Sequence, residues 1–122
     1  MTRDRISAGR QGEEIAADCL ARAGYRILAR NWRCPLGELD IVARDGETLV
    51  FVEVRTRRSA RFGSPEESVG FAKRQKLSRL AAFYLNRHGL FDIPARFDVV
   101  AVHLLPSGPE VELIRDAFDL IS

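Results

Sequence analysis

The sequence is poor in the residue types that stabilise small secreted proteins or anchor proteins in membranes. It has only two cysteines in 122 residues, Cys19 and Cys34, and their spacing does not match a zinc or redox motif. We therefore expect reduced, partly buried thiols. The longest uncharged apolar stretches have the length of strands, far short of the ~20 residues that a membrane-spanning helix needs. Because the N-terminal segment also lacks a hydrophobic signal core, we expect a cytoplasmic protein with no membrane partner.

Lysine is scarce as well, since 17 of the 19 basic residues are arginine. The net charge of +2 is too small to indicate nucleic-acid binding by itself. The basic residues are nevertheless concentrated in two short segments, which contain Arg55, Arg57, Arg58 and Arg61, and Lys73, Arg74, Lys76 and Arg79. Such patches are typical of surfaces that bind phosphates, and a solvated surface without a partner gives the same pattern.

The composition, with 46% apolar and 30% charged residues, is that of a soluble globular chain of one domain. We expect residues 1–8 to form a flexible arm and residues 9–122 a single domain. Apolar side chains at helical spacing, with Ser7 as a cap and Gly24 as a stop, predict a helix from about Gly9 to Ala23. A second amphipathic helix is predicted from Phe71 to about His88, with Gly89 as its stop.

The remaining pattern predicts an α/β fold with a mixed central sheet flanked by helices. A buried strand after the second helix favours a parallel crossover, whereas the hairpin before that helix is antiparallel. The expected strands are 25–32, 39–43, 49–54, 96–105 and a short last strand at 111–114. A turn at 34–37 joins the first two strands, and Asp45-Gly46 supplies the residues of a tight hairpin turn. Residues 57–63 are expected to form a basic loop, and 64–67 to open a short helical turn.

Acidic residues occur on both strands of the predicted hairpin. Asp40 lies near the start of the first strand, and Glu53 lies near the end of the second. Alternation places Glu53 and Arg55 on one face and Val52 and Val54 on the other. Because burying an unpaired carboxylate costs several kcal/mol, we expect these acids to be paired, hydrated or bound to a metal.

Five short motifs give the sequence a specific resemblance. They are Gly12-Glu13 with Ala16, Asn31, Gly37-Glu38-Leu39-Asp40, Phe51-Val52-Glu53-Val54-Arg55, and Arg96-Phe97-Asp98-Val99-Val100. In this order they resemble the YraN family of small bacterial endonuclease-like proteins, in the PD-(D/E)XK nuclease superfamily. The resemblance implies a restriction-endonuclease-like core of helix, three strands, helix and strand. The wider similarity is to Holliday-junction resolvases.

The resemblance implies a catalytic set of Glu13, Asp40, Glu53 and Arg55, with the three acids as metal ligands. Mg²⁺ or Mn²⁺ is the implied cofactor, and the Val54 carbonyl is a further oxygen ligand of the kind that Mg²⁺ accepts. The implied activity is hydrolysis of phosphodiesters in branched or otherwise structured DNA, and relatives of this kind also form two-fold dimers.

Arg55 departs from the superfamily pattern, in which this position is usually lysine. Arginine keeps the positive charge and can hold a phosphate oxygen, yet it does not release a proton near neutral pH. We expect it to stabilise charge rather than to act as a general base. The alternatives are a catalytically weak or inactive module that binds nucleic acid, and an adaptor for other proteins whose acids only neutralise neighbouring arginines.

Other residues are candidates for supporting roles. Glu38 shares a strand face with Asp40 and is either an outer acid of the site or a solvated residue. Asp98 is a candidate for the same outer layer or a structural partner of Arg96. Contacts to DNA phosphates are expected from residues of the two basic segments, namely Arg57, Arg58, Arg61, Lys73, Gln75 and Lys76.

Overall fold

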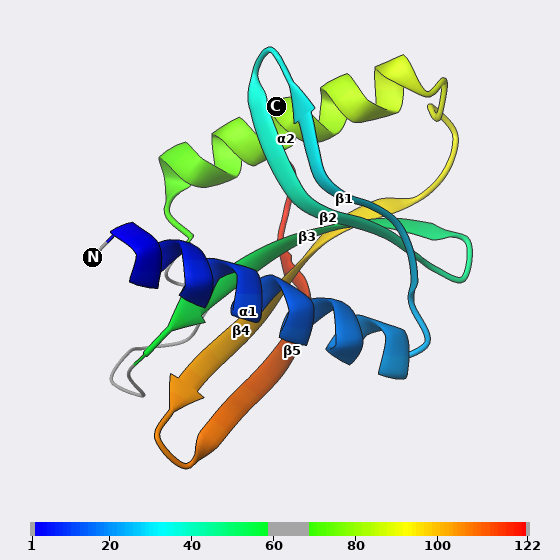
Figure 1. The fold of residues 1–122 in the computed structure, drawn as a ribbon. Helices are drawn as coiled ribbons and strands as arrows, with labels where there is room; N and C mark the ends of the chain where they lie inside the picture. Colours follow the sequence, from blue (N-terminus) through cyan, green and yellow to red (C-terminus); the bar gives the residue numbers. More distant parts are fainter. Residues whose placement is uncertain (1, 59–68, 122) are drawn as a thin grey trace.

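The computed structural model describes residues 2–58 and 69–121, with the backbone alone for residues 2–7. Two helices lie on opposite faces of a five-stranded mixed sheet, which confirms the predicted α/β architecture and is compatible with a restriction-endonuclease-like core (Figure 1). The elements are α1 (Thr2–Arg22), β1 (Arg26–Cys34), β2 (Gly37–Asp45), β3 (Thr48–Arg57), α2 (Phe71–Arg87), β4 (Ala95–Leu105) and β5 (Gly108–Phe118). None of the helices in these ranges is long and apolar enough to cross a membrane.

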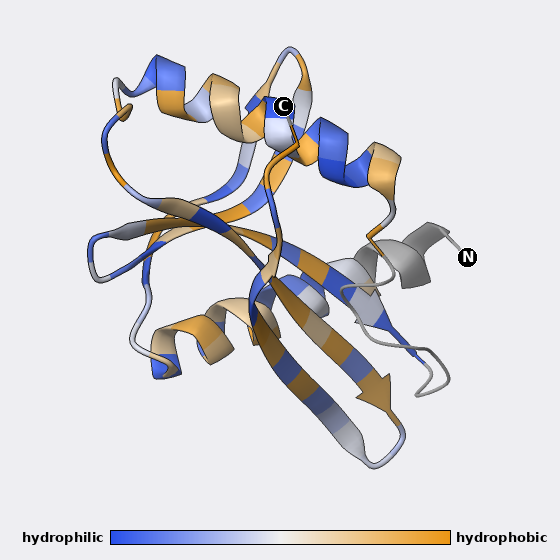
Figure 2. Ribbon diagram, turned by 180° about the vertical axis from the view of Figure 1, so that it is seen from behind, coloured by the Kyte–Doolittle hydropathy of each residue, from blue (hydrophilic) through white to orange (hydrophobic). Residues whose placement is uncertain are grey.

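The strands lie in the order β1-β2-β3-β4-β5, so that spatial order follows chain order. The pairs β1–β2, β2–β3 and β4–β5 are antiparallel, and β3–β4 is parallel. The parallel pair confirms the predicted crossover, because α2 lies between β3 and β4 in the chain. In Figure 2, β4 shows hydrophobic stretches broken by hydrophilic bands, and the edge strand β5 alternates. Residues 97–102 of β4 are buried, as expected for an interior strand.

The sheet separates two hydrophobic cores. On one face, α2 contributes Leu80 and Tyr84, which pack with Phe51 and Phe97 of the sheet. On the other face, α1 packs against the second set of strand residues; this core contains Ala16, Leu20, Ile41, Val50, Val52 and Val100. Successive residues of β3 therefore belong to different cores, as strand alternation requires. Cys19 and Cys34 are free and partly buried, as predicted.

Three predicted boundaries were wrong. Helix α1 begins at Thr2 and not near Gly9, so it includes most of the expected arm. Segment 2–8 contains neither glycine nor proline, and nothing in it stops a helix from continuing. The hairpin turn is centred on Gly46 and Glu47, since Asp45 pairs with Thr48, and Gly46 adopts the positive φ of 61°.

Strand β5 is much longer than the predicted segment 111–114. It extends over eleven residues because β4 pairs with it from Leu105 opposite Gly108 to Val99 opposite Ile114 and, after an irregularity, at Phe97 opposite Phe118. This tertiary pairing overrides the weak strand signal of the flanking residues. The predicted basic loop after Arg58 and the capping box at 64–67 lie outside the described residues.

Helix α1 approaches β3 closely at Gly12. A Cβ atom at this position would overlap the hydroxyl of Thr56. Glycine is therefore required for the close approach of the helix to the strand, although it weakens an isolated helix by about 1 kcal/mol relative to alanine. The same contact fixes the neighbouring residue, Glu13, relative to the sheet.

We expect Gly12→Ala to lower the free energy of unfolding by about 1 to 3 kcal/mol, because the overlap with Thr56 outweighs the gain in helix propensity. Thr56→Ala in the same chain should recover part of the loss, because it removes the hydroxyl and the methyl group that the new Cβ meets. Urea denaturation of the two single variants and the double variant measures this coupling. Equal effects of Gly12→Ala in both backgrounds would contradict the packing described here.

Candidate functional site

The sheet divides where β2 leaves β3. The β2–β3 ladder ends at the pair Ile41 and Val52, whereas β2 continues with β1 as far as Gly37 and β3 continues with β4 as far as Arg57. Figure 1 shows the outer part of the β1–β2 hairpin extending toward α2 instead of along β3. Asp40 and Glu53 are the first residues beyond the end of the ladder on their strands.

Asp40 lies at the point where β2 and β3 separate. Its Oδ2 atom accepts a hydrogen bond of 2.9 Å from the backbone N–H of Val54. That N–H projects from β3 toward β2, where no ladder partner follows Ile41 along β2. The N–H and C=O of one strand residue project to the same side, so the Val54 carbonyl also faces the division. Asp40 thus replaces the missing strand partner and brings its carboxyl group beside Glu53.

Glu53 is buried, with only 6% of its surface exposed, and two cations share its carboxylate. The Arg55 guanidinium and the Lys73 ammonium each lie 3.5 Å from Glu53 Oε2. Arg55 follows Glu53 on β3, whereas Lys73 comes from the first turn of α2. These distances are long for ion pairs, so the two cations compensate the carboxylate without closing around it.

The pKa of Asp40 is raised by its surroundings. Burial is the main factor that raises the pKa of Asp40, and the charge of Glu53 and a hydrogen bond between the two carboxyls raise it further, to about 7. The Val54 N–H and the charge of Lys73 act in the opposite direction. Below about pH 7, Asp40 therefore keeps its proton beside Glu53.

Glu13 lies on α1 and is not brought into this pair. Its Oε2 atom accepts a hydrogen bond of 3.2 Å from the side-chain amide of Asn31 on β1. Within residues 2–58 and 69–121, no three acidic, histidine or cysteine side chains gather closely enough to hold a metal ion. The structure thus unites Asp40, Glu53 and Arg55, and the role of Glu13 as a third ligand stays a prediction.

The two candidate outer acids have other partners. Glu38 lies opposite Arg33 across the β1–β2 pair and forms an ion pair of 2.7 Å with it. Asp98 is fully buried and belongs to a separate polar cluster. It accepts hydrogen bonds from the Tyr25 hydroxyl at 2.6 Å and from Arg96 Nε at 2.9 Å. Of the two roles that the sequence suggested for Asp98, the structure thus shows the structural pairing with Arg96.

The predicted DNA-binding residues divide into two groups. Lys73, Gln75 and Lys76 lie in the first turns of α2, and the methylene chain of Lys76 lies beside Gly37 of β2. Arg57 and Arg58 lie at the end of β3, where the guanidinium of Arg57 donates to the Thr56 carbonyl. Arg61 lies outside the described residues. The first group borders the acid pair, and the second lies farther along β3.

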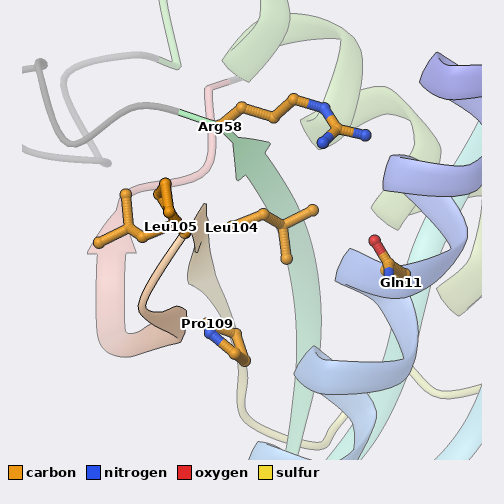
Figure 3. A pocket seen from close by; sticks show the side chains of 6 residues that line it. Gln11, Arg58, Leu104, Leu105 and Pro109 are labelled. Atoms are coloured by element: carbon orange, nitrogen blue, oxygen red, sulfur yellow. The ribbon is translucent and has the colours of Figure 1, made fainter.

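A hollow of about 470 Å³ occurs at this far end of the sheet (Figure 3). Leucine and proline side chains of the β4–β5 hairpin form its walls, and Gln11 of α1 and Arg58 add polar groups. Neither Asp40 nor Glu53 lines it. The hollow therefore contributes no group to the candidate chemistry, and the acid pair remains the candidate site.

Comparison with known families places this geometry in context. The model of a family described as "Uncharacterised protein family UPF0102" matches residues 12–102, well over half of the chain. The chain belongs to this family. The UPF0102 match confirms the resemblance to the YraN family, and it includes Glu13, Asn31, Asp40, Glu53 and Arg55.

Full-length relatives agree with the UPF0102 assignment. The UPF0102 protein of Moorella thermoacetica is 56% identical over 120 residues, which cover 97% of this chain and 100% of the relative. That of Syntrophus aciditrophicus is 52% identical over 115 residues, covering 94% and 91%. That of Geobacter sulfurreducens is 51% identical over 113 residues, covering 92% and 88%.

Sequence reasoning missed two contacts of this UPF0102 site. Lys73 was expected to bind DNA. Its contact with Glu53 could not be predicted from the sequence, because it depends on how α2 packs over β3. Asn31 was noted only as a motif residue, yet it has a left-handed backbone with φ of 52° and holds Glu13. The residue type was the available signal, because asparagine adopts positive φ more readily than other non-glycine residues.

The raised pKa of Asp40 predicts a pH-dependent stability difference between this protein and Asp40→Asn. In the unfolded chain the carboxyl loses its proton near 3.8, whereas the folded chain keeps it until about 7. The folded state therefore loses stability relative to the unfolded state as pH rises between these values. Without divalent ions, we expect Asp40→Asn to gain about 1 to 3 kcal/mol relative to the unmodified protein between pH 4 and pH 8.

Urea denaturation across this pH range measures the difference. Glu38→Gln is the matched control, because it removes a carboxylate from the same strand without changing the buried pair. Parallel pH curves for Asp40→Asn and the unmodified protein would contradict the close contact of Asp40 with Glu53.

Proposed function

We propose that this protein is a metal-dependent endonuclease that hydrolyses phosphodiesters in structured DNA. The observation that carries the proposal is the pair of carboxyl groups, Asp40 and Glu53, at the point where β2 and β3 separate. Two cations, Arg55 and Lys73, lie beside the same pair. Acids with cations at their edge suit a substrate that brings its own negative charge and a divalent ion.

The donor set fits a hard divalent cation. Asp40 and Glu53 supply carboxylate oxygens, and the Val54 carbonyl faces the same division of the sheet. Oxygen donors of this kind suit Mg²⁺ or Mn²⁺, which keep several water molecules when few protein ligands are present. When bound, the ion supplies an acidified water and neutralises charge on the phosphate. Glu13 is proposed as an additional acid on the α1 side.

The basic residues contact the phosphates of the DNA. Arg55 keeps its positive charge at all physiological pH values and stabilises the charge that develops on the phosphate. Lys73 of α2 lies beside the same acid, 3.5 Å from Glu53 Oε2. Lys76, Arg57 and Arg58 extend the positive surface away from the acids for contacts with neighbouring phosphates. Because such contacts do not read bases, the proposed specificity is for DNA shape, as in a junction or flap.

A second candidate function is DNA binding without hydrolysis. It is favoured by one observation, which is that arginine and not lysine follows the Glu53-Val54 dipeptide. A protein of this kind binds DNA through the same basic residues, and its affinity falls steeply with salt. Its affinity would survive the loss of either carboxylate.

We expect Asp40→Asn and Glu53→Gln each to lower Mg²⁺- or Mn²⁺-dependent nicking by at least about 100-fold, because each removes a charged ligand. Fluorescent four-way junctions, flaps, single strands and duplexes, together with supercoiled plasmid, serve as substrates. Glu38→Gln is the control, since its ion pair with Arg33 lies outside the acid pair. Thermal denaturation with and without Mg²⁺ should show stabilisation of the unmodified protein and none of the two variants.

Absence of cleavage by the unmodified protein on all these substrates would contradict the nuclease proposal. DNA affinity that then survived Asp40→Asn would support the binding function.

Substitutions of Arg55 test whether its side chain stabilises charge or transfers a proton during cleavage. We expect Arg55→Gln to lower the cleavage rate by about 100-fold and Arg55→Lys to keep it within about tenfold, because the side chain contributes charge. Single-turnover cleavage of a junction at saturating protein measures both. A full rate for Arg55→Gln would contradict a role of Arg55 in chemistry. A large gain for Arg55→Lys would show instead that the guanidinium limits proton transfer.

A further inference from the structure

The β1–β2 strand pair changes direction at one point, where Asn31 lies opposite Asp40. These two residues stand between the ladder pairs Arg30–Ile41 and Trp32–Leu39. Asn31 is one of only two non-glycine residues with positive φ in the described part of the chain. A left-handed residue inside a strand rotates the residues that follow it relative to those that precede it.

The packing of the flanking side chains shows this rotation on both strands. On β2, Ile41 belongs to the core beneath α1, whereas Leu39, two residues away, belongs to the core beneath α2. On β1, Arg30 bonds Glu14 of α1 at 2.9 Å, whereas the ring of Trp32 packs on Tyr84 of α2. Regular alternation would keep both members of each pair on one face. Both strands therefore exchange faces at the Asn31–Asp40 position.

This exchange has a direct consequence for Asp40. It is the residue of β2 at which the strand turns away from β3, and its side chain reaches across to the Val54 N–H. A β2 strand that continued along β3 would pair Asp40 with Glu53 as an ordinary strand position, and the Val54 N–H would find its partner in the β2 backbone. The position opposite Asn31 is thus where β2 turns away from β3 and where the Asp40 carboxyl group meets the Val54 N–H.

Asn31 also connects α1 to the same point. Its amide nitrogen donates to Glu13 Oε2 at 3.2 Å. One residue thus sets the backbone geometry opposite Asp40 and orients the acid of the helix. Amides that fix the orientation of acidic ligands are typical of functional centres, and their loss commonly reduces affinity or activity 10- to 100-fold.

We propose that Asn31 is a positioning residue of the acid site: its left-handed backbone places Asp40 beside Glu53, and its amide fixes the orientation of Glu13 on α1. This inference rests on the proposed nuclease function for its catalytic consequence, and its geometric part can be tested without metal or DNA. Asparagine suits both tasks, because it tolerates positive φ and carries an amide donor.

The backbone task is tested by hydrogen exchange of the Val54 amide, followed by NMR. Asn31→Val should lower the protection of this amide at least about tenfold, because a β-branched residue resists positive φ and the turn that places Asp40 is lost. Asn31→Gly should keep the protection, because glycine adopts positive φ freely. Arg33→Val is the matched control on the same strand, at a position without positive φ. Unchanged Val54 protection in Asn31→Val, with the fold intact, would overturn the proposal.

The amide task is tested by a double-mutant cycle in single-turnover cleavage. Asn31→Gly and Glu13→Gln should each lower the rate about tenfold, and the double variant should be no slower than the slower single variant. Asn31→Asp, which keeps the backbone preference and replaces the donor by a second acceptor, should be as slow as Asn31→Gly. Additive losses, or a full rate for Asn31→Gly, would overturn the positioning role while leaving the nuclease proposal intact. Absence of cleavage by the unmodified protein would overturn the nuclease proposal and the catalytic consequence of this role, whereas the backbone part is decided by the exchange of the Val54 amide.

Discussion

Two carboxyl groups held side by side in a half-buried place are the constraint on which the site depends. Asp40 and Glu53 meet because the hydrogen-bond ladder between β2 and β3 ends one residue before each of them. Burial and the charge of Glu53 raise the pKa of Asp40 to about 7, and Arg55 and Lys73 lie beside Glu53. Under the proposed function, a divalent cation supplies the positive charge that makes this arrangement favourable.

The rest of the fold keeps this arrangement in place from both sides of the sheet. Helix α1 approaches β3 through the contact of Gly12 with Thr56, and helix α2 brings Lys73 over Glu53. The polar cluster around Asp98 lies apart from the acid pair. There Tyr25 and Arg96 satisfy the buried carboxylate, and burial with the bond to Asp98 raises the pKa of Tyr25 to about 12. In the part of the chain that the structure describes, the buried acid Asp98 thus has close partners, whereas the cations beside Glu53 lie at longer distances.

Asp98 and the pair of Asp40 and Glu53 differ in how closely their oxygen atoms are bound. This difference distinguishes a structural carboxylate from candidate catalytic ones in this UPF0102 protein. Asp98 has hydrogen bonds of 2.6 and 2.9 Å to side chains and one of 2.9 Å from the Asp116 N–H, so its oxygen atoms are occupied. The cations beside Glu53 lie at 3.5 Å, and one of them comes on a flexible lysine stem. A carboxylate bound as tightly as Asp98 has little capacity for a ligand, and the proposed function assigns ligand binding to Asp40 and Glu53 instead.

The sequence by itself determined the local elements and the identity of the acids. The helical stripe before Gly24, the β-rich hairpin around Gly46 and the apolar strand after Pro94 predicted the architecture, because hydrophobic periodicity is a local property. The motifs also predicted the family and selected Asp40, Glu53 and Arg55. The start of α1 and the length of β5 were missed, since weak local signals there yield to helix continuation and to pairing with β4.

Only the tertiary structure decided which of these groups meet. It brought Asp40 to the Val54 N–H, placed Lys73 of α2 on Glu53, and left Glu13 bound to Asn31 outside the pair. These contacts join residues 14 to 20 positions apart in sequence, and they depend on where a ladder ends and on the rotation at one left-handed residue. Hydrophobic periodicity in the sequence indicates which face of a helix or strand a side chain occupies. The position at which a strand ladder ends is set instead by the packing of both helices against the sheet.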